Sequence, residues 1–168
     1  MRSAIEPIEY PPPITSDDVA CILSTSGTTG KPKAVLFTHN NLIFSERSFV
    51  KGTERTADDV MFMASPLNHA TGFFHGLISP MILGGRTVLQ QDFRPAQAIE
   101  QMNREGCTWS MGATPFIYDM LKCIEFEDGP RFETLQLFLC GGAPCPATSC
   151  SARTATGSCS PRYTGRRK

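Results

Sequence analysis

The stretch Ser24-Thr25-Ser26-Gly27-Thr28-Thr29-Gly30-Lys31-Pro32-Lys33 sets the expectations for the rest of the chain. Apolar runs at residues 19–23 and 34–37 flank it, so we predict a strand, a polar loop and a second strand. Glycines let backbone N–H groups converge on one anion, while hydroxyls and a lysine add donors and positive charge. The loop therefore predicts a polyphosphate site formed by Thr25, Ser26, Gly27, Thr28, Thr29, Gly30 and Lys33.

This loop differs from the Walker phosphate loop. The Walker pattern has four residues between its glycines and a serine or threonine directly after its lysine. Here two residues separate Gly27 from Gly30, and Pro32 follows Lys31, which disfavours a Walker-type ATPase. A flexible Gly/Thr turn in a β-hairpin is the alternative interpretation of the same residues.

Apolar strand-like runs and helical periodicities alternate along the chain beyond this loop. We expect strands at 60–63, 86–89, 107–111 and 135–140, and helices from a Thr38 cap to Val50, before Gly84-Gly85, at 95–105 and at 114–124. Such alternation is typical of an α/β fold with a mostly parallel sheet and helices on both faces.

Composition favours a cytoplasmic protein with reduced thiols. The 168-residue chain has seven cysteines, an odd number, and no Cys-x-x-Cys pair, so we expect neither a disulfide framework nor a metal site. His69 and His75 are six residues apart, which places them on different faces of a helix and disfavours a two-histidine metal site. No apolar run approaches the roughly 20 residues of a transmembrane helix, and no secretory leader is visible.

Three segments in order carry a family resemblance. Thr-Ser-Gly-Thr-Thr-Gly-x-Pro-Lys resembles the phosphate-loop signature of the adenylate-forming enzymes, the superfamily that includes acyl-CoA synthetases. The segment Pro66–Phe73 resembles the one that carries a histidine beside the acyl pocket, and Leu139–Pro144 resembles the turn that passes the adenine. Ala34 stands where the family usually has glycine.

The resemblance implies roles for individual residues. It places the lysine after the proline, hence Lys33 rather than Lys31, on the phosphates, and it implies that His69 lies at the acyl pocket. It implies that the adenine contacts the backbone of Gly141, Gly142, Ala143 and Pro144. The wording of residues 68–73 and 112–116 suggests a branch that acts on medium-chain or cyclic carboxylates.

The resemblance also implies a reaction. A carboxylate and ATP give an acyl-adenylate and pyrophosphate, and CoA then displaces AMP, with Mg²⁺ assisting. The expected partners are therefore a small carboxylate, ATP and CoA rather than nucleic acid, while the oligomeric state stays open. The expected fold is an incomplete part of the large N-terminal domain of an acyl-CoA synthetase, with residues 1–18 as a connector and 19–146 as a partial AMP-binding domain.

After Pro146 the resemblance stops. Residues 147–168 contain no Leu, Ile, Val or Phe and no acid, but five Lys or Arg, so residues 1–146 carry a formal charge of about −5. Codons that can encode Pro161–Lys168 (ccg agg tat acg ggt cga cgg aag) give Glu-Val-Tyr-Gly-Ser-Thr-Glu when read from the third base. That string contains the family's Tyr-Gly-x-Thr-Glu motif, whose glutamate binds Mg²⁺. We therefore expect a disordered tail in a shifted reading frame.

These expectations make the chain a fragment of an acyl-CoA synthetase. It retains no catalytic residue that we can assign, so we expect no thioester formation by this chain alone. The alternative is a non-catalytic nucleotide-binding or interaction module, whose basic tail binds nucleic acid.

Overall fold

A computed structural model describes residues 13–25, 32–141 and 158–159. The chain divides into two compact units, residues 1–43 and 44–168, which are treated separately below. Three predicted regions lie outside the described residues: residues 26–30 of the phosphate loop, residues 142–144 of the predicted adenine site, and most of the basic tail.

The first unit contains an antiparallel hairpin. Strand β1 (Val19–Thr25) pairs with β2 (Lys33–Thr38), and Thr25 is the register partner of Lys33 at the end of the ladder. The predicted phosphate loop thus joins two antiparallel strands, so the two predicted strands are confirmed, while the choice between a phosphate site and a simple turn stays open.

Helix α1 (His39–Thr53) follows β2 directly and crosses from the first unit into the second. Thr38 Oγ1 accepts a hydrogen bond from the Asn41 N–H at 3.2 Å, and Asn41 Oδ1 accepts one from the Thr38 N–H at 3.3 Å. This reciprocal pair satisfies two backbone donors at the helix start. The predicted Thr38 cap is confirmed.

The second unit contains a sheet with the strand order β4-β3-β5-β6-β7 among the described residues. Strands β3 (Val60–Met63), β4 (Arg86–Leu89), β5 (Trp109–Ala113) and β6 (Leu137–Gly141) are parallel to their neighbours. Strand β7 (Ser158–Cys159) pairs antiparallel with β6. Two residues of the tail therefore form a strand that its composition does not predict, since backbone pairing needs no apolar side chain.

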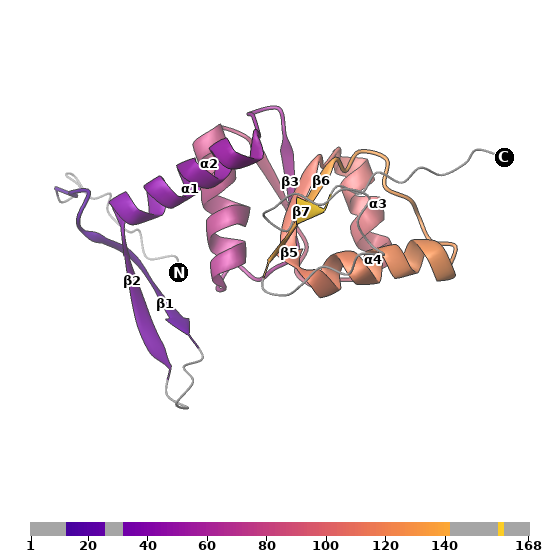
Figure 1. Ribbon diagram of the computed structural model, residues 1–168, viewed down its shortest axis with the longest axis horizontal. Helices are drawn as coiled ribbons and strands as arrows, with labels where there is room; N and C mark the ends of the chain where they lie inside the picture. The colour runs from indigo at the N-terminus through magenta and orange to yellow at the C-terminus, as the bar shows by residue number, and fades with distance from the viewer. Residues whose placement is uncertain (1–12, 26–31, 142–157, 160–168) are drawn as a thin grey trace, which may run out of the picture. The chain divides into compact units, whose positions relative to one another are not determined.

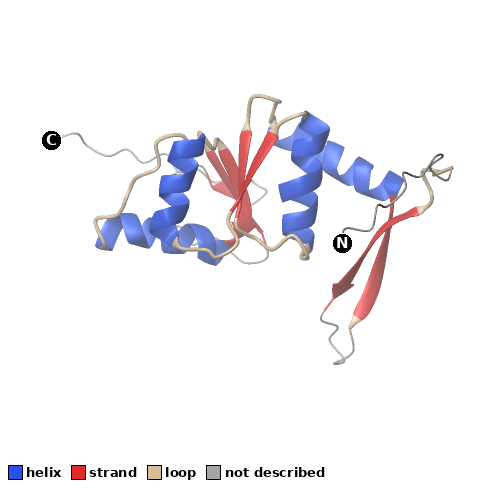
Figure 2. Cartoon of the chain, turned by 180° about the vertical axis from the view of Figure 1, so that it is seen from behind, coloured by secondary structure: helices blue, strands red, loops and turns tan. Residues whose placement is uncertain are grey.

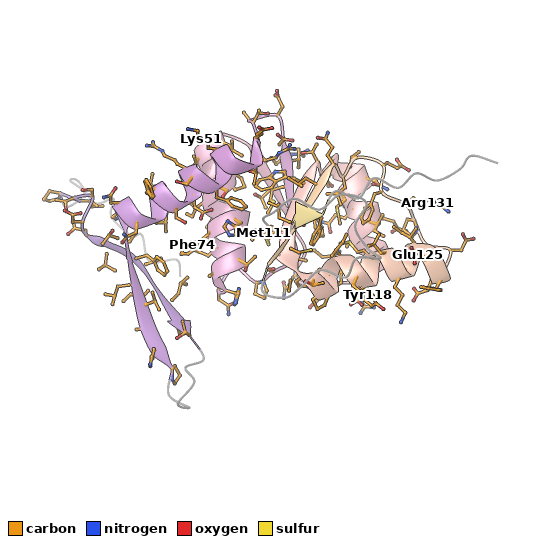
Figure 3. All side chains as sticks on the ribbon, in the orientation of Figure 1. Lys51, Phe74, Met111, Tyr118, Glu125 and Arg131 are labelled. Atoms are coloured by element: carbon orange, nitrogen blue, oxygen red, sulfur yellow. The ribbon has the colours of Figure 1, made fainter. Side chains whose placement is uncertain are left out.

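Helices cover both faces of this sheet, as the sequence predicts (Figure 2). Helices α3 (Pro95–Glu105) and α4 (Thr114–Phe126) bury one face, whose core includes Phe62, Ile99 and Phe138. Met61, Met63 and Trp109 form the core on the opposite face, with Phe49 of α1 packed against them. Tyr118 and Glu125 lie on the outward side of α4 (Figure 3).

The helix predicted before Gly84-Gly85 covers the Trp109 face, and its first part is a π-helix, which was not predicted. Segment η1 (Thr71–Ile78) continues into α2 (Ser79–Leu83), which ends at Gly84 in the left-handed conformation, with φ 69°. Thr87 Oγ1 of β4 donates to the Gly76 carbonyl of η1 at 2.8 Å. The helical segment is thus tied to the strand that follows it.

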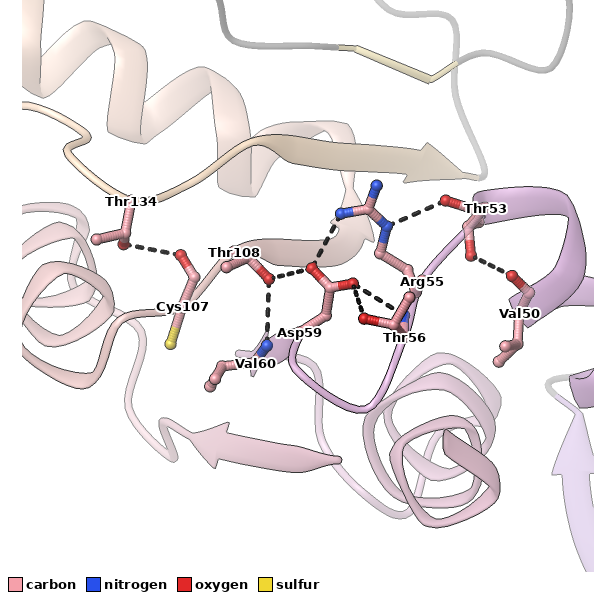
Figure 4. A network of polar contacts seen from close by, with 9 residues as sticks. All are labelled: Val50, Thr53, Arg55, Thr56, Asp59, Val60, Cys107, Thr108 and Thr134. Carbon is pink, nitrogen blue, oxygen red and sulfur yellow. Dashed lines mark hydrogen bonds and ion pairs between the residues drawn. The ribbon is translucent and has the colours of Figure 1, made fainter. Parts of the chain in front are cut away.

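The amino ends of the strands are joined by a polar network (Figure 4). Asp59 Oδ1 accepts from Thr108 Oγ1 at 2.7 Å and from Arg55 Nη1 at 3.1 Å, while Asp59 Oδ2 accepts from the Thr56 N–H at 2.9 Å. Thr108 Oγ1 in turn accepts from the Val60 N–H at 3.1 Å. Strand β5 begins at Trp109, two residues later than predicted.

None of the helices in the described ranges is long and apolar enough to cross a membrane.

Candidate functional site

A cavity of about 510 Å³ lies where β3, β5 and β6 end. In open α/β sheets, ligands bind beyond the carboxyl ends of the strands, because loops from several strands converge there. The lining comes from five segments of the second unit: Ser65 and Pro66 after β3, His69 and Thr71, Met111 to Ala113 of β5, Phe116 of α4, and Gly141 of β6. The cavity therefore joins two of the three sequence motifs.

His69 has a defined orientation in this lining. The imidazole Nδ1 of His69 accepts a hydrogen bond from the backbone N–H of Thr71 at 3.3 Å, and the backbone N–H of His69 donates to the Pro66 carbonyl at 3.0 Å. Since Nδ1 is an acceptor, the proton of the neutral ring lies on Nε2. No partner for Nε2 is found within the described ranges, so this N–H is available to donate to a carboxylate.

Gly72 holds the 65–71 loop against the start of η1. A Cβ at this position would collide with the Pro66 carbonyl oxygen and lie 2.6 Å from the Ser65 carbonyl oxygen. Only a residue without a side chain lets the helix start so close to the backbone of the loop. The position of His69 thus depends on a glycine three residues away.

Aromatic packing forms the opposite wall. Phe116 of α4 lines the cavity and meets Phe93 edge-on, with ring centroids 4.7 Å apart. A Cβ on Gly112 would lie 2.9 Å from Phe116 Cδ2, so the glycine lets the ring lie directly against β5. The wall is apolar, which suits the hydrocarbon part of a carboxylate rather than a charged group.

A second cavity, of about 730 Å³, shares Ser65 and Pro66 with the first. It is lined by the segments that follow β3 and β4, including Asn68, Gln90 and Asp92. It is larger, but among the described residues neither His69 nor Gly141 lines it. The chemistry of the sequence motifs converges on the smaller cavity, which we take as the candidate site.

Beside the site, Glu46 is fully buried and paired. Its Oε2 accepts from Ser79 Oγ at 2.5 Å and lies 3.0 Å from His75 Nδ1. The network links α1 to both parts of the π/α segment. Sequence reasoning considered His75 only as a metal ligand and missed this pair. Part of the signal was available, because Glu46 falls on the same helical face as Leu42, Phe49 and Val50, where an ionisable group must find partners, but the sequence did not indicate which distant residues those partners are.

Trp109 is a second feature that the sequence did not indicate. Its side chain is fully buried, and its Nε1 is the only buried side-chain nitrogen or oxygen among the described residues that has no hydrogen-bond partner. Leaving a buried donor unpaired costs roughly 1–3 kcal/mol. A phenylalanine would avoid that cost, but its smaller ring would leave part of the buried space empty.

The structure brings only part of the predicted site into view. His69 and Gly141 line the same cavity, and their roles at the acyl group and the adenine stay predictions. Thr25 Oγ1 donates to the Lys33 backbone carbonyl at 3.4 Å, and both residues are exposed at the end of the hairpin. These two residues belong to the first unit, and their phosphate role stays a prediction, as does the role of residues 26–30 and 142–144.

Comparisons with known proteins agree with this α/β architecture and with the motifs. The family described as AMP-binding enzyme matches residues 2–163, which includes much of the predicted tail. The medium-chain fatty-acid–CoA ligase of Escherichia coli (strain K12) is 42% identical over 140 residues, covering 82% of this chain and 25% of that ligase. Feruloyl-CoA synthase of an Amycolatopsis species is 31% identical over 135 residues, covering 80% of this chain and 27% of the synthase.

A solved structure gives the same result. O-succinylbenzoate CoA synthetase (MenE) from Bacillus subtilis, in complex with ATP and magnesium ion, superposes with a TM-score of 0.76. The two chains are 32% identical, and the match covers 88% of this chain and 30% of the synthetase. The chain described here belongs to the AMP-binding enzyme family. The relatives that it resembles include acyl-CoA ligases. It spans between a quarter and a third of the length of these relatives.

Proposed function

We propose that this chain forms the carboxylate- and nucleotide-binding part of an ATP-dependent acyl-CoA synthetase that acts on medium-chain or cyclic carboxylates. The observation that carries the proposal is the cavity at the carboxyl ends of β3, β5 and β6, where His69 and Gly141 meet an apolar wall. The printed names of the relatives, which include a medium-chain fatty-acid ligase, a feruloyl-CoA synthase and an o-succinylbenzoate synthetase, support the substrate class.

In this proposal the residues have distinct tasks. The Nε2–H of His69 donates to the substrate carboxylate, while Phe116 and Met111 pack against its hydrocarbon part. Gly141 leaves room at the end of β6 for a flat base. Thr25 and Lys33 would hold phosphate oxygens of ATP, since a hydroxyl and an ammonium are suitable donors for them. When bound, ATP activates the carboxylate for transfer to CoA.

Magnesium does not fit the described part of the cavity. Mg²⁺ prefers carboxylate and water oxygens, and no carboxylate lies among the described residues that line the cavity. We therefore assign no magnesium ligand and no step of the reaction to the metal here.

Binding to the purified 168-residue chain tests the proposal. We expect octanoate to bind and to shift the imidazole resonances of His69 in NMR spectra. The His69→Ala variant should bind octanoate about tenfold more weakly, because a charge-assisted hydrogen bond contributes about 1.4 kcal/mol or more. Its thermal stability should change little, since His69 is exposed.

The matched control is His39→Ala, which removes a histidine at the start of α1 that does not line the cavity. Its octanoate affinity should equal that of the wild type. Equal losses in both variants, or no octanoate binding by the wild-type chain, would contradict the proposal.

A further inference from the structure

The inner side of the cavity points toward Trp109. Residues 109, 111 and 113 of β5 project from the same face, since successive side chains of a strand alternate. Met111 and Ala113 line the cavity. Trp109 lies two residues further from the carboxyl edge, about 7 Å along the strand. The strand that forms one wall of the cavity thus leads directly to the unpartnered indole N–H.

The wall of the cavity that η1 forms leads to the same place. Thr71 lines the cavity at the start of η1, and His75 lies four residues further along this helix, away from the carboxyl edge. The Phe49 ring packs against both His75 and Trp109. The centroid of the Phe49 ring lies 4.1 Å from that of His75 and 6.2 Å from that of Trp109. The two walls therefore converge on a ring cluster of His75, Phe49 and Trp109.

Methionine separates the cavity from this cluster. Met111 (labelled in Figure 3) is half-buried, lines the cavity and packs against the core of Met61, Met63 and Trp109. Methionine side chains are unbranched and adapt to irregular contents, so this partition can yield to a ligand more readily than branched residues would. The partition is soft, and a hydrogen-bond donor without a partner lies behind it.

We propose that Trp109 is a specificity-determining residue, whose Nε1–H donates to a neutral oxygen acceptor at the far end of the substrate's hydrocarbon chain. This inference rests on the proposed acyl-binding role of the cavity and narrows it. The substrate class becomes carboxylic acids that carry a second, uncharged oxygen, such as a keto group. Met111 moves aside to admit that end of the chain.

The surroundings exclude a second carboxylate. Phe49, Met61 and Met63 are apolar, and one N–H cannot compensate for the burial of a charge. Glu46 lies against His75 in the same cluster, so a second anion would also meet a carboxyl group held there. A dicarboxylate should therefore bind no better than a simple fatty acid.

The single tryptophan of the chain makes the test specific, since the spectrum of the ¹⁵N-labelled protein contains one indole N–H resonance. The probes are matched pairs of carboxylates at three chain lengths: hexanoate with 5-oxohexanoate, octanoate with 7-oxooctanoate, and decanoate with 9-oxodecanoate. Suberate serves as the dicarboxylate. At one chain length we expect the keto acid to bind about tenfold more tightly than its partner and to move the indole resonance downfield, while suberate shows neither effect.

In the Trp109→Phe variant, the keto acid should bind about as tightly as the fatty acid of the same length, so that the tenfold preference is lost. Tyr118→Phe, on the exposed side of α4, should keep the preference and is the control. If Trp109→Phe fails to fold, as judged by circular dichroism, the wild-type indole resonance still decides the question.

Two failures can be told apart. If octanoate binds and moves the His69 resonances, but keto acids show no preference and leave the indole resonance unchanged, the Trp109 inference is overturned and the acyl-binding proposal stands. If no carboxylate binds, the acyl-binding proposal is overturned, and the Trp109 inference with it.

Discussion

The two ends of the parallel sheet differ in how their polar groups are paired. At the amino ends, Asp59, Thr108 and Arg55 close a network in which donors and acceptors match (Figure 4). At the carboxyl ends, the same strands β3 and β5 leave a cavity, with one N–H of His69 available in it. The side chains at the amino ends hold the strands together. The side chains at the carboxyl ends are therefore not needed for that purpose. The difference shows which residues can serve binding and which serve stability.

The largest test of this contrast is Gly72→Ala at the carboxyl edge. The new Cβ would collide with the Pro66 carbonyl, and backbone cannot move aside cheaply. We expect a loss of about 3 kcal/mol in the free energy of unfolding together with the loss of octanoate binding, measured by urea denaturation and calorimetry. Gly52→Ala in α1, where nothing lies within 4 Å of a new Cβ, is the control. Intact binding in Gly72→Ala would show that the loop does not position His69.

Asp59→Ala breaks the opposite edge. Removing this carboxylate leaves Arg55 and the donors of Thr56 and Thr108 without their partner, so unfolding should become easier by about 2–3 kcal/mol. The octanoate affinity of the folded variant should be unchanged, because Asp59 lies at the other end of the strands. Asp58→Ala, which changes an exposed neighbour, should alter neither quantity.

The same carboxylate has a pH signature. Burial acts to raise the pKa of Asp59, but the hydrogen bonds from Thr108 and Thr56 and the charge of Arg55 outweigh it and hold the pKa below the usual 3.8. A lowered folded-state pKa contributes stability that is present above the unfolded value and lost as the pH falls through the folded one. The wild type should therefore lose more stability than Asp59→Ala on acidification below about pH 4.

Cys107 gives the smallest effect, on the alkaline side. Burial raises the pKa of this thiol from 9.0 to about 11, with Glu105 adding to the rise and Arg86 opposing it. The unfolded thiol ionises first, so stability is full below pH 9 and is lost as the pH rises toward 11. Between pH 8 and 10 we expect the wild type to lose roughly 1 kcal/mol more than Cys107→Ala, as measured by denaturant titration. Parallel pH profiles would show that the thiol ionises freely in the folded state.

Local sequence patterns predicted most of the elements of both units. The apolar runs at 60–63 and 86–89 became β3 and β4 with the same bounds, and Pro95 begins α3 as its position before an amphipathic run indicates. The parallel arrangement followed from the alternation of strands and helices. These features depend on neighbouring residues, so they can be inferred from short windows of sequence.

The missed features all depend on contacts between distant residues. Glu46 meets His75 and Ser79, which are 29 and 33 positions away, and a window of one helix does not contain both partners. The unpaired N–H of Trp109 depends on what surrounds it, not on its own strand. His69 was placed at the cavity only because a family resemblance supplied its role, since a lone histidine before an apolar helix has no predictable partner.

The bond from Thr87 to the Gly76 carbonyl has a consequence for how this sequence can vary. The hydroxyl of Thr87 donates this bond from strand β4 to the π-helix that precedes it. Serine keeps the hydroxyl, whereas valine has nearly the same shape as threonine but no donor. Valine suits a strand better than serine does. Position 87 should nevertheless accept serine more readily than valine in evolution, although its side chain does not line the candidate site.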